Sequence, residues 1–113
     1  MSDEDLTAQK CHACEGGTPP LSPDEANDLL QQVDADWQIS SDGKWIRREL
    51  KFKNFYHTIA FVNAVAWIAN KEDHHPDLEV GYNRCLVQFS THAIGGLSRN
   101  DFICAAKVDA LRD

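Results

Sequence analysis

Two short stretches of the chain carry side chains that can move protons or bind a metal. The first contains the adjacent pair His74 and His75, which is followed directly by a proline. The second ends in His92, which follows a serine and a threonine. Histidine titrates near neutral pH and is the commonest metal ligand in proteins. Three histidines brought into one place therefore suggest either acid–base catalysis or metal binding.

A long helix is expected to lead into the first pair. Asn54 is a good cap, and apolar residues follow at helical spacing from Phe55 to about Asn70. The residue before a proline disfavours helical angles, so Pro76 places the helix end at the two histidines. The predicted stripe is Phe55, Ile59, Val62, Ala66 and Ala69. Further apolar residues surround it, which predicts a helix that is central or shared with a partner subunit.

A hairpin is expected between the two histidine stretches. Residues 77–80 and 84–91 have the pattern of strands, and Gly81, Tyr82 and Asn83 form the turn. An antiparallel hairpin returns the end of its second strand to the start of its first. His92 should therefore lie close to His75 and the proline.

The remaining segments complete the scaffold. A helix begins with the Ser-Pro-Asp-Glu capping box at 22–25, and another begins at Ser98. Asp42 and Gly43 predict a tight turn between a short strand at 37–39 and a longer one at 44–52. The resulting order, α-β-β-α-β-β-α, predicts an α+β fold in which helices pack on one face of a four-stranded antiparallel sheet.

Composition limits the function classes. The 113 residues suggest one domain, which we place at 21–113 after a flexible N-terminal tail over 1–20. Lys and Arg number 11 against 18 Asp and Glu, a net charge of −7, which argues against a nucleic-acid partner. The sequence has no apolar run long enough for a membrane span and no signal-peptide pattern at its start. We therefore expect a cytoplasmic protein with reduced thiols and no membrane partner.

The predicted tail contains a Cys-x-x-Cys pair, Cys11 and Cys14. This spacing suits two zinc ligands, but a second pair at useful spacing is missing because Cys85 and Cys104 are isolated. Haem attachment is excluded because a glutamate, not a histidine, follows Cys14. An essential role is not expected, with metal capture and redox chemistry as the alternatives.

Acid–base catalysis explains the histidines better than a metal does. Adjacent histidines such as His74 and His75 often cannot both point at one ion, and no metal ligand is predicted. Acid–base work needs one neutral imidazole to accept a proton and one imidazolium to give one. Asp73 and Asp101 are candidates to orient these rings.

The residues then resemble a known family, the pterin-4a-carbinolamine dehydratases, over about residues 22–113. The matching positions are Asp73-His74-His75-Pro76, Tyr82, Ser90-Thr91-His92, Gly96-Leu97 and Asp101. The resemblance implies loss of water from a 4a-hydroxytetrahydropterin to give a quinonoid dihydropterin. It also implies a link to an aromatic amino-acid hydroxylase, whose pterin the enzyme recycles. The pterin is a substrate, and no cofactor is expected.

The resemblance also assigns roles. It implies that His74 and His92 act as acid and base at the 4a-hydroxyl and N5, while His75 holds the hydroxyl or the ring. It implies that Asp73, Ser90, Thr91 and Asp101 bind the pterin.

Two positions depart from the family pattern. Asn70 stands where an acidic or basic residue is usual, and Ala93 where animal members carry Glu. The alternative function is a non-catalytic dimerisation module, because animal members also partner a homeodomain transcription factor. In either case a homodimer or homotetramer is expected.

Overall fold

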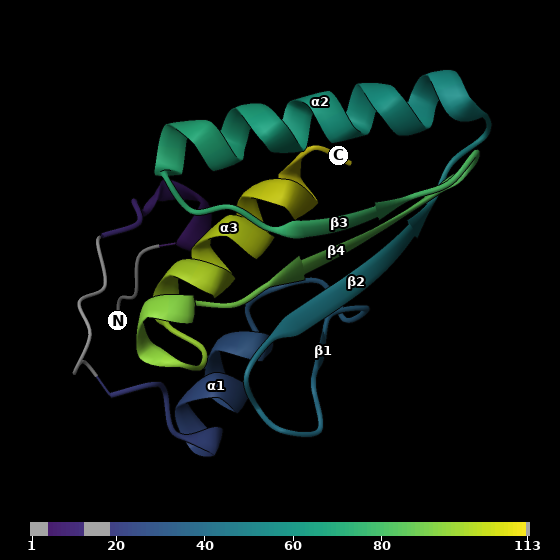
Figure 1. Ribbon diagram of the computed structural model, residues 1–113. Helices are drawn as coiled ribbons and strands as arrows, with labels where there is room; N and C mark the ends of the chain where they lie inside the picture. The colour runs from purple at the N-terminus through teal and green to yellow at the C-terminus, as the bar shows by residue number, and fades with distance from the viewer. Residues whose placement is uncertain (1–4, 13–18, 113) are drawn as a thin grey trace.

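A computed structural model of the protein describes residues 5–12 and 19–112 (Figure 1). The elements, in chain order, are η1 (Leu6–Ala8), α1 (Pro23–Leu30), β1 (Gln38–Ile39), β2 (Ile46–Lys51), α2 (Phe55–Glu72), β3 (Asp77–Val80), β4 (Arg84–Phe89), η2 (His92–Ile94) and α3 (Arg99–Ala110). Apart from the two 3₁₀ turns, this is the predicted order. In the part of the chain that is described, no helix combines the length and the apolar character needed to cross a membrane.

The four strands form one antiparallel sheet in the order β1-β2-β4-β3. The second hairpin pairs Asp77 with Gln88 and Val80 with Cys85, so its turn lies at 81–83 as expected. The first hairpin turns at Gly43, whose φ of 72° suits glycine. The predicted α+β class and antiparallel sheet are therefore confirmed.

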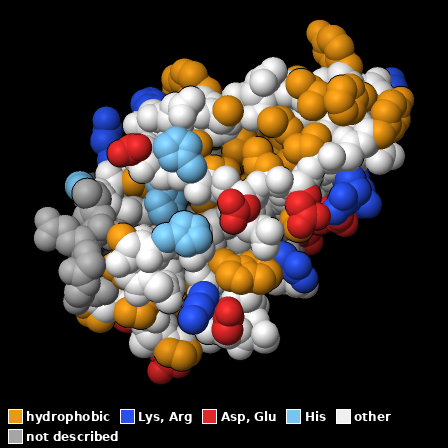
Figure 2. All heavy atoms as spheres, viewed as in Figure 1, with side chains coloured by type: hydrophobic (Ala, Val, Ile, Leu, Met, Phe, Trp, Pro, Cys, Tyr) orange, Lys and Arg blue, Asp and Glu red, His pale blue; other side chains and the backbone are white. Residues whose placement is uncertain are grey.

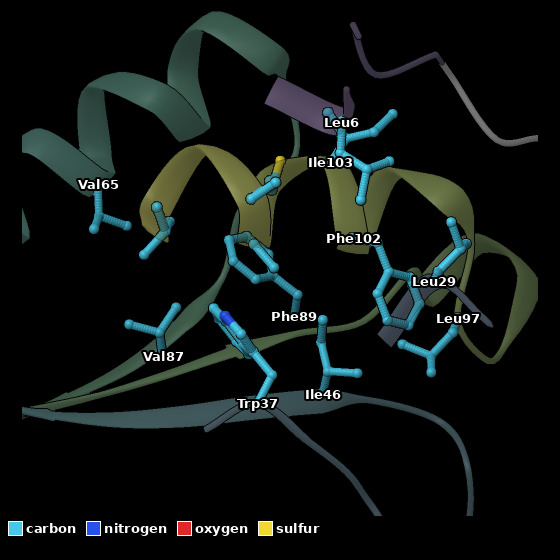
Figure 3. Close-up of a cluster of buried hydrophobic side chains, with 14 of the residues drawn as sticks. Leu6, Leu29, Trp37, Ile46, Val65, Val87, Phe89, Leu97, Phe102 and Ile103 are labelled. Carbon is cyan, nitrogen blue, oxygen red and sulfur yellow. The ribbon is translucent and has the colours of Figure 1, made fainter. Parts of the chain in front are cut away.

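One face of the sheet carries the core (Figure 3). Ile46 from β2 and Val87 and Phe89 from β4 are buried against the helices, and Trp37 lies 6.1 Å from the Phe89 ring. The alternate residues of β2, such as Arg47, are exposed, and those of β4 are partly exposed. Helices thus cover one face and leave the other in water. Val80, predicted to face inward, is 43% exposed because it lies near the open end of an edge strand.

The central helix is α3, not α2. In α3 every residue from Asn100 to Ala106 is buried, whereas α2 leaves Tyr56 and Trp67 exposed. Figure 1 shows α3 lying between α2 and α1. The buried side of α2 is formed by Thr58, Phe61, Val65, Ile68 and Ala69, so the predicted stripe was partly wrong. A helix that is apolar around much of its girth has no single periodic signal, which is why the sequence misplaced its buried side.

The structure describes residues 5–12 and 19–20 of the predicted flexible tail, and segment 5–12 packs against the domain. Leu6 is 1% exposed and belongs to the core, and the Lys107 ammonium donates to the Thr7 carbonyl at 2.8 Å. This part is therefore ordered by core contact, which corrects the prediction for those residues. Cys14 lies outside the described residues.

A charged cluster joins β2 to the end of α3 on the face of the sheet that the helices cover. The Arg48 side chain is 10% exposed and pairs with Asp109, with Asp34 and Asp36 at 3.6 and 3.9 Å. Asp109 also accepts from the Trp37 indole N–H at 2.8 Å. Arg48 interrupts the apolar alternation of its strand because it neutralises these acids.

Replacing Arg48 with methionine should therefore destabilise the protein. The Arg48→Met variant keeps the packing volume but leaves Asp109 without its cation. We therefore expect the free energy of unfolding to fall by about 2 to 4 kcal/mol. Urea denaturation followed by tryptophan fluorescence measures this. The control is Arg47→Met on the exposed face, expected to change stability by no more than about 0.5 kcal/mol. Equal effects in both variants would contradict a structural role for the cluster.

Candidate active site

The end of α2 sets the direction in which His74 leaves the helix. Asp73 has φ 53° and ψ 42°, a left-handed conformation that ends the helix, and its N–H donates to the Ala69 carbonyl. The N–H of His74 donates to the same carbonyl at 3.1 Å. The His74 ring then stacks on Phe89, with 6.0 Å between centroids and 11° between planes. A strand residue of the core thus supports the first histidine.

The second hairpin brings the other stretch to this point. Asp77 pairs with Gln88, and continuing that register beyond the strands sets Thr91 opposite His74. Thr91 then pairs with Gly96 in an isolated bridge, which closes the small loop that contains His92. Strand pairing thus carries the second stretch back toward the end of α2, and the predicted closeness of His92 to His75 and the proline stays a prediction.

Asp101 joins the two stretches from the first turn of α3. Its Oδ2 accepts from the backbone N–H of Ser98 at 2.9 Å and from the Thr91 hydroxyl at 2.9 Å. The Ser98 hydroxyl lies 2.7 Å from the Thr91 hydroxyl; because the Thr91 proton is given to Asp101, Ser98 donates here. The same residues form the capping box of α3. Helix capping therefore holds this carboxylate in place.

The other oxygen of Asp101 contacts His74. Nε2 of His74 lies 2.6 Å from Oδ1 of Asp101, and the side chains are 11% and 0% exposed. A carboxylate accepts hydrogen bonds, so Nε2 of the neutral ring carries the proton. Nδ1 then has its lone pair available, and no hydrogen bond to it is seen among the described residues. This is the arrangement of a base held by a carboxylate.

His75 and His92, the other two histidines of the predicted site, are more exposed than His74. His75 Nε2 lies 3.1 Å from Oδ1 of Asn70, one helical turn back. His92 opens η2 immediately after Thr91. Figure 2 shows histidine side chains gathered on one face of the molecule. This region lies at the C-terminal ends of α2 and β4. Solvent-facing imidazoles beside a buried histidine–carboxylate pair can exchange protons with a bound molecule.

The remaining predicted residues differ in what their side chains do. Thr91 is 5% exposed, and its hydroxyl is used to hold Asp101. The Ser90 hydroxyl donates to the Lys44 carbonyl at 2.8 Å. The Asp73 side chain is exposed beside His74. Three of the four predicted pterin-binding side chains, those of Ser90, Thr91 and Asp101, are therefore hydrogen-bonded within the protein. The backbone of Thr91 is also paired, because its N–H donates to the Gly96 carbonyl and its carbonyl accepts from the N–H of Ile94.

The structure adds residues that the sequence did not assign to the site. Ser98 was predicted only as the start of a helix, and Phe89 only as part of the strand at 84–91. Asn70 was noted as a departure from the family pattern, and it is the partner of His75. Across residues 5–12 and 19–112, no group of three or more His, Cys, Asp or Glu side chains has an arrangement that would hold a metal ion.

Fold and site together define a small α+β protein with a histidine–carboxylate pair beside exposed histidines. The sequence profile of the family described as pterin 4 alpha carbinolamine dehydratase matches residues 19–111. The chain belongs to this family. It is 60% identical over 107 residues to a protein of Nitrosomonas eutropha, covering 95% of this chain and 93% of that one. A Legionella pneumophila protein is 55% identical and covers 95% of each chain. Both carry the name pterin-4-alpha-carbinolamine dehydratase provisionally.

Solved structures agree with the fold. A crystal structure of a "transcriptional coactivator/pterin dehydratase" from Brucella melitensis superposes with a TM-score of 0.79 at 34% identity, covering 83% of this chain and 99% of that one. A pterin dehydratase-like protein, titled as a RuBisCO assembly factor of the alpha-carboxysome, has a TM-score of 0.60 at 22% identity, covering 67% and 88%. The second likeness concerns the fold alone.

Changing Asp101 to asparagine should reverse the tautomer of His74. Ser98 N–H can only donate, so the amide oxygen of the new side chain should occupy the Oδ2 position and its NH₂ should face His74. Nε2 must then accept, which moves the ring proton to Nδ1. Long-range ¹H–¹⁵N spectra of the neutral ring distinguish the two tautomers. An unchanged Nε2–H tautomer in Asp101→Asn would contradict the carboxylate's control of the ring, and His57, on the exposed start of α2, is the internal reference.

Proposed function

We propose that the protein is a dehydratase that removes water from 4a-hydroxytetrahydropterins. The observation that carries the proposal is the pair of His74 and Asp101, joined at 2.6 Å with the carboxylate fully buried. Membership of the pterin 4 alpha carbinolamine dehydratase family supports the substrate class. The carboxylate fixes the tautomer of one imidazole, and His92 follows within one residue of the threonine that holds the carboxylate.

The reaction requires two proton transfers. The bond between C4a and the hydroxyl oxygen breaks, and an acid donates a proton so that water leaves. A base removes the proton of N5, and its electrons form the double bond between N5 and C4a of the quinonoid product. Imidazole near neutral pH suits both steps, each worth about 100-fold or more in rate.

The residues divide into those that touch substrate and those that position them. In this proposal His74 and His92 are the acid and base, and His75, held toward Asn70, contacts the hydroxyl or the ring. Asp73 and the backbone of Ser90 bind the pterin edge, while Thr91, whose backbone is paired with the loop at 94–96, shapes this wall of the site. Asp101 is a positioning residue, because both of its oxygens are occupied by protein donors. The reaction needs no cofactor, and an aromatic amino-acid hydroxylase would supply the substrate.

A second candidate is a protein-interaction role, favoured by the exposed aromatic residues of α2 and the second hairpin. Phe55 and Tyr82 stack with 6.4 Å between centroids although they are 50% and 66% exposed, and Tyr56 is 78% exposed. Aromatic groups of this kind are enriched at interfaces. A second copy of the chain is the proposed occupant, giving a homodimer or homotetramer. The two roles are separable: histidine variants should affect only turnover, and Tyr56→Ser only association, measured by sedimentation.

The first test is the decay of chemically generated 4a-hydroxytetrahydropterin in a stopped-flow spectrometer, with and without the protein. We expect acceleration that is unchanged by a metal chelator, because imidazoles suffice for both proton transfers. Acceleration that disappears with the chelator would replace this mechanism with a metal-dependent one. No acceleration would overturn the dehydratase proposal.

The matched variants identify the residues. His74→Ala and His92→Ala should each lower turnover by about 100-fold or more if each transfers a proton. His92→Ala should keep the thermal stability of the parent protein within a few degrees. His74→Ala leaves one oxygen of the fully buried Asp101 without its donor, so this variant should unfold at a lower temperature, and its turnover is measured well below that temperature. His57→Ala, at the exposed start of α2, is the control and should retain full activity. Normal turnover in either site variant would remove that histidine from the mechanism.

A further inference from the structure

The N-terminal segment 5–12 ties together the two helix ends that supply the histidine–carboxylate pair. The backbone N–H of Cys11 donates to Glu72 at the end of α2, at 2.9 Å. The next residue, His12, exchanges two hydrogen bonds with the Asn100 side chain in the first turn of α3. Glu72 lies two residues before His74 and Asn100 one residue before Asp101. We call residues 5–12 the strap.

A pair of thiols joins the strap to α3 at the same place. Sγ of Cys11 lies 3.5 Å from Sγ of Cys104, which is on the α3 turn after Asn100. Two sulfurs at that separation need to approach by only about 1.5 Å to reach a disulfide bond length. These are residues 93 positions apart in the sequence, so the chain folds specifically to bring them together.

The two thiols differ in access. Cys11 is partly exposed, whereas Cys104 has no solvent exposure. The hydrogen bond with Cys11, and after it burial, raise the pKa of the Cys104 thiol, and the carboxylates of Glu72 and Asp101 add to this. Reactivity of cysteine depends on access and on thiolate formation. An oxidant in solution therefore meets Cys11 first, and Cys104 is placed to react with what forms there.

We propose that Cys11 and Cys104 are an oxidation site at which a peroxide forms a disulfide between the strap and α3. The Cys11 sulfur attacks the peroxide oxygen, the O–O bond breaks, and a sulfenic acid and one water are formed. The Cys104 sulfur then attacks the Cys11 sulfur, the S–O bond breaks, and hydroxide leaves with the Cys104 proton as a second water. In total the two thiols lose two electrons, and one hydrogen peroxide is reduced to two waters.

The disulfide would lock the strap over the ends of α2 and α3. In the reduced protein the strap is held by hydrogen bonds and by the packing of the Leu6 and Cys11 side chains against the core. A cross-link that closes a loop of this length removes many conformations of the unfolded chain. The oxidised protein should therefore unfold at a higher temperature, and a reductant should reverse the shift. This inference does not depend on the proposed dehydratase activity.

The experiment treats the full chain with a small excess of hydrogen peroxide, blocks remaining thiols, and maps disulfides by mass spectrometry of proteolytic peptides. We expect a peptide pair joined through Cys11 and Cys104, and a rise in the unfolding midpoint on the order of 10 °C that dithiothreitol abolishes. The Cys14→Ser variant should behave in the same way, because Cys14 takes no part. Cys11→Ser and Cys104→Ala should each show neither the cross-linked peptide nor the rise.

Other outcomes overturn the proposal. A disulfide only between Cys11 and Cys14 would mean that the Cys-x-x-Cys pair is the oxidation site instead. Disulfides only between molecules, or a sulfinic acid at Cys11 with Cys104 still reduced, would show that Cys104 does not react with the oxidised strap. Because Cys11 is partly exposed, Cys11→Ser gives a folded control even if Cys104→Ala disturbs the core.

Discussion

Burying a carboxylate away from solvent costs free energy unless hydrogen-bond donors from the protein replace water. Asp101 has no solvent exposure and accepts hydrogen bonds from three segments of the chain. Ser98 precedes α3, Thr91 follows β4, and His74 follows α2. The interaction therefore fastens the start of the central helix to the ends of a strand and of another helix. The cap that begins α3 and the partner of His74 are one side chain, so assembling the fold also assembles the site.

The parts of the fold that follow from local rules could be predicted from the sequence. Capping residues such as Ser22 and Ser98 satisfy helix N–H groups within a few positions, and a turn at Gly43 depends on one backbone angle. Alternation identified the buried face of β4 because only one side of the sheet is covered. Which helix lies at the centre depends on long-range packing. The apolar character of α2 predicted a helix that is central or shared with a partner subunit, but within the chain it is α3 whose residues from Asn100 to Ala106 are all buried.

The candidate site was predictable to a similar extent. Strand pairing carries the second stretch back toward the end of α2, and acidic Asp101, which binds both Thr91 and His74, was recognisable as a residue that could orient a ring. The direction of each side chain was not predictable. Thr91 points at Asp101 rather than outward, and Asn70 meets His75 across one helical turn, because rotamers are decided by neighbours distant in sequence. The burial of Leu6 was missed for the same reason, since a single leucine in a polar segment has no periodic pattern.

The burial of Leu6 separates two ways of defining a domain. The part of the chain that the family profile recognises begins at residue 19, but the hydrophobic core receives a side chain from residue 6. The segment that the family profile matches is therefore shorter than the unit of folding. A protein engineer who trimmed the chain to the recognisable family segment would keep every histidine of the site. The same cut would remove η1 and leave a hole over α3, the helix against which η1 packs.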